Sequence, residues 1–184
     1  ESSKSVEAAP RDVQFRSINL QTGVIELFNF GFTDEPLDGW RFCTHNTTSA
    51  LLYSLFDGFD GMTIESGTSF FIHTQNDLGA EDADNINLST VAPIRFHFAM
   101  PMTNVAFGLL NYCPPTAFAN GNQIADHVQW SLGGVDNTTA DGRSCEAENG
   151  GVWMDHNAWI VTASTTNRIQ LIDNTGSVLQ GPGD

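Results

Sequence analysis

Residues 22–45 read TGVIELFNFGFTDEPLDGWRFCTH, and this stretch decides the fold class. Polar and apolar residues alternate from Val24 to Asn29, as expected for a half-buried strand. A polar turn follows, and Leu37 to Trp40 lead into a second alternating strand. Two short strands joined in this way are typical of the edge of a β-sandwich and not of a catalytic loop. The stretch therefore predicts a secreted binding or structural module.

Short β-branched or aromatic runs recur along the whole chain, bounded by Gly, Asn, Asp, Ser and Pro. No sustained helical spacing of apolar residues interrupts them. We expect strands near residues 13–20, 23–30, 38–44, 50–56, 69–75, 93–99, 104–111, 124–130, 152–162, 167–173 and 177–180. Many short strands with such turns predict an antiparallel sandwich or barrel. The turn at residues 173–176 (DNTG) adds an extra C-terminal hairpin.

The expected strand at residues 124–130 carries an acid on its apolar side. Ile124, Val128 and Trp130 share one face of this strand with Asp126. A buried carboxylate must be hydrogen-bonded, because burying it without partners is costly. We therefore expect Asp126 to accept hydrogen bonds from backbone amides of a neighbouring turn.

The length of 184 residues suits one domain, and its charge is lopsided. Twenty-two Asp and Glu stand against seven Lys and Arg, a net charge of −15. This balance argues against nucleic acid and anionic membranes as partners, because both need a basic surface. No run approaches the roughly 18 apolar residues of a membrane helix. Residues 1–12 are polar, so we expect a flexible, processed N-terminal segment ahead of a single domain at residues 13–184.

Four groups of residues resemble, in the same order, strands of the lamin tail domain family. They are residues 25–29 (IELFN), 37–42 (LDGWRF), 53–56 with 62–72, and 105–111 with 124–130. The resemblance covers about residues 13–134 and leaves residues 135–184 as an extension. It implies an all-β, immunoglobulin-like antiparallel β-sandwich with long loops. It also implies a non-catalytic binding or assembly module that is secreted, periplasmic or on the cell surface.

One acidic loop is a candidate calcium site. Its oxygen ligands lie within nine residues, at Asp77, Glu81, Asp82, Asp84 and Asn85. Calcium takes about six to eight oxygen ligands from clustered carboxylates and carbonyls. The spacing does not match an EF-hand loop. The alternative interpretation is a solvated acidic loop.

Thiol, imidazole and thioether groups form a second candidate metal site, for copper. Cys43 and His45 lie on the same side of an expected strand. The full candidate set is Cys43, His45, His97, Met100, Met102 and His156. The histidines are scattered, without HxH or HxxxH spacing. The alternative is that each is an ordinary surface or core residue, with Cys43 a small buried one.

Trp153 and Trp159 are candidate ligand-binding residues for a carbohydrate. Exposed aromatic rings stack on sugars, and residues six apart in one strand share a face. The alternative is that both rings fill the core. Cys113 and Cys145 lie in expected loops and form a candidate disulfide, although connectivity cannot be deduced from sequence alone.

Motifs of common enzymes are missing: the chain has no GxSxG, no HExxH and no phosphate-binding Gly-rich loop before a helix. We therefore expect a non-catalytic binding or assembly module. Its expected partner is an extracellular protein or polysaccharide. One alternative is an extracellular or periplasmic metal-binding protein, with calcium or copper. Another is a carbohydrate-binding module.

Overall fold

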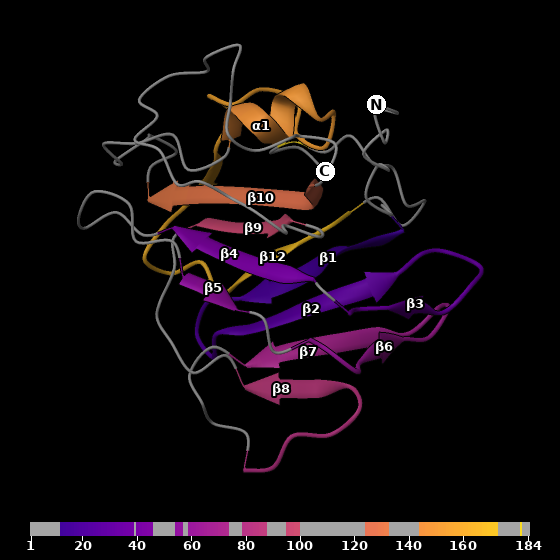
Figure 1. The fold of residues 1–184 in the computed structure, drawn as a ribbon. Coiled ribbons are helices and arrows are strands. Elements are labelled where there is room, and N and C mark those ends of the chain that lie inside the picture. The colour runs from indigo at the N-terminus through magenta and orange to yellow at the C-terminus, as the bar shows by residue number, and fades with distance from the viewer. Residues whose placement is uncertain are drawn as a thin grey trace, which may run out of the picture.

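The computed structural model describes residues 12–38, 40–45, 54–56, 59–73, 79–87, 95–99, 124–132, 144–172 and 181. Strands dominate these residues, accompanied by one six-residue helix (Figure 1). The predicted all-β class is therefore confirmed. Among the described residues, no helix combines the length and apolar character needed to cross a membrane.

The first sheet has five strands in the order β12-β1-β2-β7-β8. Its strands are β1 (Val13–Asn19), β2 (Val24–Asn29), β7 (Ser69–His73), β8 (Asn85–Asn87) and β12 (Arg168–Gln170). Strand β2 is the one expected from the opening stretch. It pairs antiparallel with β1 on one side and with β7 on the other, and so lies at the centre of the sheet.

The second sheet has five strands in the order β11-β10-β9-β4-β5. Its strands are β4 (Arg41–His45), β5 (Ser54–Phe56), β9 (Arg95–Ala99), β10 (Ile124–Leu132) and β11 (Ile160–Thr162). A separate two-stranded sheet pairs β3 (Glu35–Pro36) with β6 (Thr63–Ile64). The opening stretch thus supplies β2 to the first sheet, β3 to the small sheet and β4 to the second.

The prediction of a purely antiparallel fold is wrong at two strand pairs. Strand β8 runs parallel to β7, and β11 runs parallel to β10, so both large sheets are mixed. Tight hairpin turns join only antiparallel strands, whereas parallel strands need longer connections. Residues 74–84 separate β7 from β8, and residues 133–159 separate β10 from β11. These two long connections therefore allow the parallel pairs.

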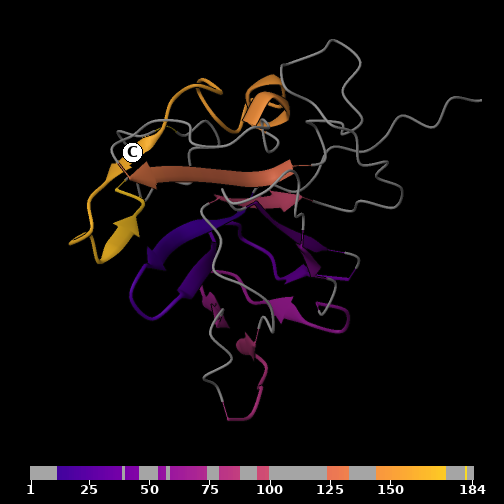
Figure 2. The same ribbon diagram turned by 90° about the vertical axis from the view of Figure 1, so that its left-hand side faces the viewer.

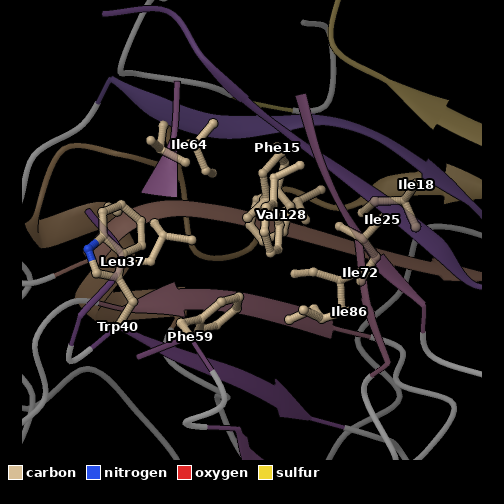
Figure 3. Close-up of a cluster of buried hydrophobic side chains, with 14 of the residues drawn as sticks. Phe15, Ile18, Ile25, Leu37, Trp40, Phe59, Ile64, Ile72, Ile86 and Val128 are labelled. Atoms are coloured by element: carbon tan, nitrogen blue, oxygen red, sulfur yellow. The ribbon is translucent and has the colours of Figure 1, made fainter. Parts of the chain in front are cut away.

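The two five-stranded sheets share one hydrophobic core (Figure 3). Phe15 and Ile72 of the first sheet belong to the same buried cluster as Val128 of β10. In Figure 2 the salmon strand β10 lies above the indigo strands β1 and β2. Trp40 is completely buried in this cluster, next to Leu37 in Figure 3. Burial of such a ring removes on the order of 200 Å² from water, which makes Trp40 a main core residue.

Asn29 shows why the central strand ends in an amide. Its side chain is completely buried. Nδ2 donates to the backbone oxygens of Thr33 at 2.9 Å and Ile64 at 3.0 Å. Oδ1 accepts from the Gly31 N–H at 2.8 Å. The amide therefore ties the turn after β2 to strand β6, and its polar groups are satisfied inside the core.

Asp126 is buried and hydrogen-bonded to backbone amides, as the sequence predicts, but its donors lie in strands and not in a neighbouring turn. Its Oδ2 accepts from the Phe15 N–H at 2.6 Å, and its Oδ1 accepts from the His127 N–H at 2.7 Å. The first donor lies in β1, so this bond links the two sheets. Ile124, however, belongs to a second cluster, on the other side of β10. The register with β9 shifts between Ile124 and Asp126, and this irregularity moves Ile124 off the expected face.

Residues 144–172 contribute a strand to each of the two large sheets and do not form only an added hairpin. Helix α1 (Ser144–Asn149) and the turns after it cover the outer side of β10 (Figure 1). Strand β11 then extends the second sheet, and β12 extends the first. The strand expected at residues 152–162 is therefore reduced to β11. The strands expected at residues 104–111 and 177–180, and with the latter the hairpin, lie outside the described residues.

The end of α1 is a turn that requires glycine. Gly151 has a φ of +72°. Its N–H donates to the Glu148 oxygen, and the Val152 N–H donates to the Ala147 oxygen. These two bonds are the Schellman pattern of helix termination. They turn the chain back, so that Ala147, Val152 and Trp153 form one cluster with Ile124 of β10.

Candidate functional site

The outer face of the first sheet carries an organised polar cluster around Glu26 of β2. The Ser17 hydroxyl of β1 donates to Glu26 Oε2 at 2.8 Å. The Ser69 hydroxyl of β7 donates to Glu26 Oε1 at 2.7 Å. Only 14% of the Glu26 side chain is exposed. The acid of the IELFN stretch is therefore held by the strands on both sides of it.

Two arginines flank this glutamate. Arg168 Nη2 of β12 lies 3.5 Å from Glu26 Oε2 and donates to the Ser17 hydroxyl at 2.9 Å. Arg16 Nε of β1 lies 3.9 Å from Glu26 Oε1, and its guanidinium lies 4.3 Å from the centre of the Phe28 ring. The exposed fractions are 51% for the Arg168 side chain and 36% for that of Arg16. Both cations thus remain accessible to a partner.

We call Arg16, Glu26, Phe28 and Arg168 the arginine face. It contains two positive charges and one negative charge, in a chain whose net charge is −15. Phe30 packs edge-on against Phe28, with ring centres 4.7 Å apart. The alternation from Val24 to Asn29 puts Glu26 and Phe28 on the same face of one strand, but it could not place the arginines. They come from strands at opposite ends of the chain, β1 and β12, which are paired in the sheet.

The outer face of the second sheet is different, because α1 and the following turns cover it at β10. Gln129 of β10 is completely buried there. Its Nε2 donates to the backbone oxygens of His156 at 3.0 Å and Ala158 at 2.7 Å. Trp153 Nε1 also donates to the Ala158 oxygen, at 3.0 Å. We call residues 144–159, which lie over β10, the covering segment. Side chains of β10 and of the covering segment therefore hold the turn at residues 156–158.

His127 of β10 is the second buried polar residue on this covered face. Its Nε2 lies 3.0 Å from Gln129 Oε1, and its ring packs edge-on against Trp153. Gln129 Nε2 donates to two carbonyls, so Gln129 Oε1 must be the acceptor toward His127. His127 Nε2 therefore carries the hydrogen of this bond. Sequence analysis did not single out His127.

Glu148, Asp155 and His156 gather at the surface of the covering segment. Their ligand atoms lie within 4.8 Å of one another. His156 Nδ1 lies 2.5 Å from Glu148 Oε2 and 3.7 Å from Asp155 Oδ1. Two carboxylates and one imidazole suit a hard or borderline cation better than copper. Glu148 Oε2 also accepts from the His156 N–H at 3.0 Å, so these groups already fasten α1 to the turn after it.

The candidate calcium loop contains a self-contained turn. Asp82 Oδ1 accepts from the Asp84 N–H at 2.9 Å and from Asn85 Nδ2 at 2.8 Å. These two hydrogen bonds, first that from the Asn85 side chain, lower the pKa of the Asp82 carboxyl below its ordinary value. Glu81, Asp82 and Asp84 are exposed, and within the described part of the loop they do not gather as three ligands. Asp77 lies outside the described residues.

The structure places some of the candidate copper residues next to one another and others apart. Cys43 of β4 stands directly opposite His97 of β9, and His45 lies two residues along β4. His156 lies apart from these strands, with Glu148 and Asp155. Met100 and Met102 lie outside the described residues. The strand register therefore brings together half of the set that the sequence suggested.

Trp153 and Trp159 are not a surface platform for a ligand. Their exposed fractions are 1% and 6%, and they lie in turns of the covering segment and not in one strand. Trp153 packs with Ile124 and Ala147 in the cluster over β10. This is the core-filling alternative. Both rings are buried because residues 144–159 fold back onto the second sheet. The alternation pattern of single strands does not predict such a contact.

The disulfide between Cys113 and Cys145 stays a prediction. Cys145 lies in α1 and not in a loop. Cys113 lies outside the described residues.

Comparison of the sequence with known proteins finds no matching family model and no similar curated protein.

Proposed function

We propose that this chain is a non-catalytic binding module that acts outside the cytoplasm and recognises a partner through the arginine face. The observation that carries the proposal is the pair of accessible arginines held around Glu26 on the open face of the first sheet. Guanidinium groups form paired hydrogen bonds with carboxylates, phosphates and sulfates. The expected partner is therefore an extracellular polysaccharide or protein segment that presents carboxylate or sulfate groups.

The charge of the rest of the chain strengthens this choice of ligand. A net charge of −15 repels anionic polymers from most of the surface. Any binding of such a polymer must then be localised where cations are concentrated. The Phe28 ring under Arg16 adds an apolar surface next to the charges, which suits an extended ligand lying across the strands.

The finer description of the fold belongs to this proposal. Two five-stranded sheets around one core support an immunoglobulin-like sandwich of the lamin-tail type, and the two parallel strand pairs are the departure from its antiparallel pattern. The IELFN and LDGWRF stretches support it further, because Asn29 and Trp40 have structural roles in the core. A binding and assembly role, with secretion or display at the cell surface, follows from the same resemblance.

A binding titration tests the proposal. The complete chain is titrated with a polyuronate, with polyglutamate and with a neutral glucan, at low and at physiological salt. We expect binding of at least one acidic polymer, weakened by salt, and no binding of the glucan. The double variant Arg16→Ala/Arg168→Ala should lose at least about tenfold in affinity, corresponding to about 1.4 kcal/mol. Lys4→Ala, which removes one positive charge at another position of the sequence, serves as the control. Equal affinity of the double variant and the wild type would refute the proposal.

A further inference from the structure

Three side chains that can ligate a metal converge where the covering segment turns back after α1. Glu148 lies in the last turn of α1, and Asp155 and His156 lie in the turns that follow. One ligand atom of each residue lies within 4.8 Å of the other two. All three side chains are partly exposed, so an ion can reach them from solvent.

We propose that Glu148, Asp155 and His156 bind a borderline divalent metal ion of the Zn²⁺ type. Two carboxylates and one imidazole are donors that zinc accepts, and water completes its coordination. Zinc holds such donors at about 2.1 Å, so two donors of a tetrahedral site lie about 3.3 Å apart. His156 Nδ1 lies 3.7 Å from Asp155 Oδ1 and 2.5 Å from Glu148 Oε2. The three groups therefore need to shift by less than about 1 Å to surround an ion.

Hydrogen bonds hold the turn that carries two of these ligands. Asp155 Oδ1 accepts from the Asn157 N–H at 2.8 Å, and the Asp155 backbone oxygen accepts from the Ala158 N–H at 2.9 Å. The His156 backbone oxygen accepts from Gln129 Nε2 of β10 at 3.0 Å. The turn is thus fixed to the second sheet without an ion, and this lowers the cost of ordering the ligands when an ion binds.

Asn157 provides an outer-sphere partner for His156. Its Nδ2 lies 3.0 Å from His156 Nε2 and can only donate, so in the neutral ring Nε2 accepts and Nδ1 carries the hydrogen. A metal on Nδ1 requires this hydrogen to be on Nε2 instead, which exchange with solvent allows. Half a turn of the Asn157 amide then brings Oδ1 opposite the Nε2–H. Ligating histidines usually donate their second N–H to an oxygen in this way.

The charges around the site favour a cation and the imidazole favours zinc. The net charge of −15 attracts divalent cations to the surface, and two carboxylates lie side by side here. Calcium and magnesium take oxygen ligands, whereas imidazole suits zinc, so His156 should make the site selective. The site is separate from the arginine face, which lies on the first sheet. Zinc binding should therefore not depend on Arg16 or Arg168.

Zinc binding by the complete chain tests the proposal. The protein is stripped with a chelator and titrated with Zn²⁺ by calorimetry, alone and in excess Ca²⁺. We expect binding that Ca²⁺ does not prevent. Glu148→Gln, Asp155→Asn and His156→Gln should each lower the affinity by at least about tenfold, because loss of even an outer-sphere partner has effects of that size. Glu65→Gln and His73→Gln are the matched controls and should bind like the wild type.

Imidazole nitrogen NMR of the wild-type protein gives a readout that a purely structural role of these residues would not change. Zinc should shift the Nδ1 signal of His156 and leave its Nε2 protonated. Asn157→Ala should weaken binding by about tenfold, as expected for an outer-sphere partner. Three results would overturn the proposal: no zinc binding by the wild type, unchanged His156 signals in the presence of zinc, or wild-type affinity in His156→Gln. Circular dichroism identifies any variant that fails to fold, and the NMR result then decides.

Discussion

The outer faces of the two sheets differ in whether their polar side chains are accessible to solvent. On the first sheet, Glu26 lies on an open face, where hydroxyls and guanidinium groups of neighbouring strands surround it. On the second sheet, Gln129 and His127 lie under α1 and the following turns, and both are completely buried. Strand alternation produces a polar outer face in both cases. What differs is whether a later segment of the chain covers that face.

Polar groups are available for a partner on the open face of the first sheet but not on the covered face of the second. Under the covering segment, the Gln129 amide is used to hold backbone carbonyls, so its contribution is structural and large. On the open face, water competes for every bond, so each one contributes less to folding but remains accessible to a ligand. We therefore expect substitutions on the covered face to affect stability and those on the open face to affect binding.

The largest effect should follow from Gln129→Ala. It removes the donor to the carbonyls of His156 and Ala158 and the acceptor of the His127 Nε2–H, so that at Ala158 only the bond from Trp153 Nε1 is kept. We expect a loss of about 3 kcal/mol in the free energy of unfolding, measured by urea denaturation. Gln170→Ala, at an exposed position of β12, is the control and should change it by less than about 0.5 kcal/mol. Equal effects would remove the distinction between the two faces.

A smaller effect is expected for Glu26→Ala on the open face. The substitution removes the acceptor of the Ser17 and Ser69 hydroxyls and the counter-charge of the two arginines. We expect a loss of about 1 to 2 kcal/mol in unfolding free energy. Affinity for an acidic polymer should increase in the same variant, because a negative charge has left the arginine face. A stability loss larger than that of Gln129→Ala would reverse the proposed ranking.

The turn that folds the covering segment back should be sensitive to a single methyl group. Gly151 has a φ of +72°, a conformation that costs L-residues about 1 kcal/mol or slightly more. Gly151→Ala should therefore lower the unfolding free energy by about 1 kcal/mol. Gly79→Ala is the matched control, since no atom lies within 4 Å of the added Cβ and its φ is not positive. If both variants are equally stable, the Schellman turn does not determine how the segment is folded back.

The smallest effect is expected at the exposed edge of the first sheet. Hydrogen bonds from the Asn85 side chain and the Asp84 backbone lower the pKa of Asp82 in the folded protein. This stabilisation is present above the unfolded value of 3.8 and is lost as the pH falls through the lower folded value. Asp82→Asn should therefore lower the melting temperature slightly at pH 7, and the difference should disappear well below pH 3.8. A difference that stays the same well below pH 3.8 would contradict this explanation.

Much of the scaffold could be predicted from local patterns. The expected strands near residues 13–20, 23–30, 69–75 and 124–130 correspond to β1, β2, β7 and β10. In each of these segments, consecutive residues alternate between apolar and polar or are mostly apolar, and this local pattern predicts a strand. The bonded state of Asp126 was predictable for the same reason, because a carboxylate between apolar neighbours has to find donors.

The pairing of distant segments could not be predicted in this way. Helix α1 has six residues, too few for a periodic apolar pattern, although Gly150 and Gly151 mark its end. The pairing of Cys43 with His97 depends on the register of two strands far apart in the sequence. The arginine face likewise needs β12 beside β1. Local periodicity contains no information about such neighbours.

Quenching of tryptophan fluorescence tests most directly whether residues 144–159 cover the second sheet. Trp40, Trp130, Trp153 and Trp159 are each no more than 6% exposed. We therefore predict that acrylamide quenches the native protein weakly, and that Trp153→Phe and Trp159→Phe leave the accessible fraction unchanged. Strong quenching that disappears in these two variants would show that their rings face solvent. It would contradict both the covered face and the structural role assigned to Gln129.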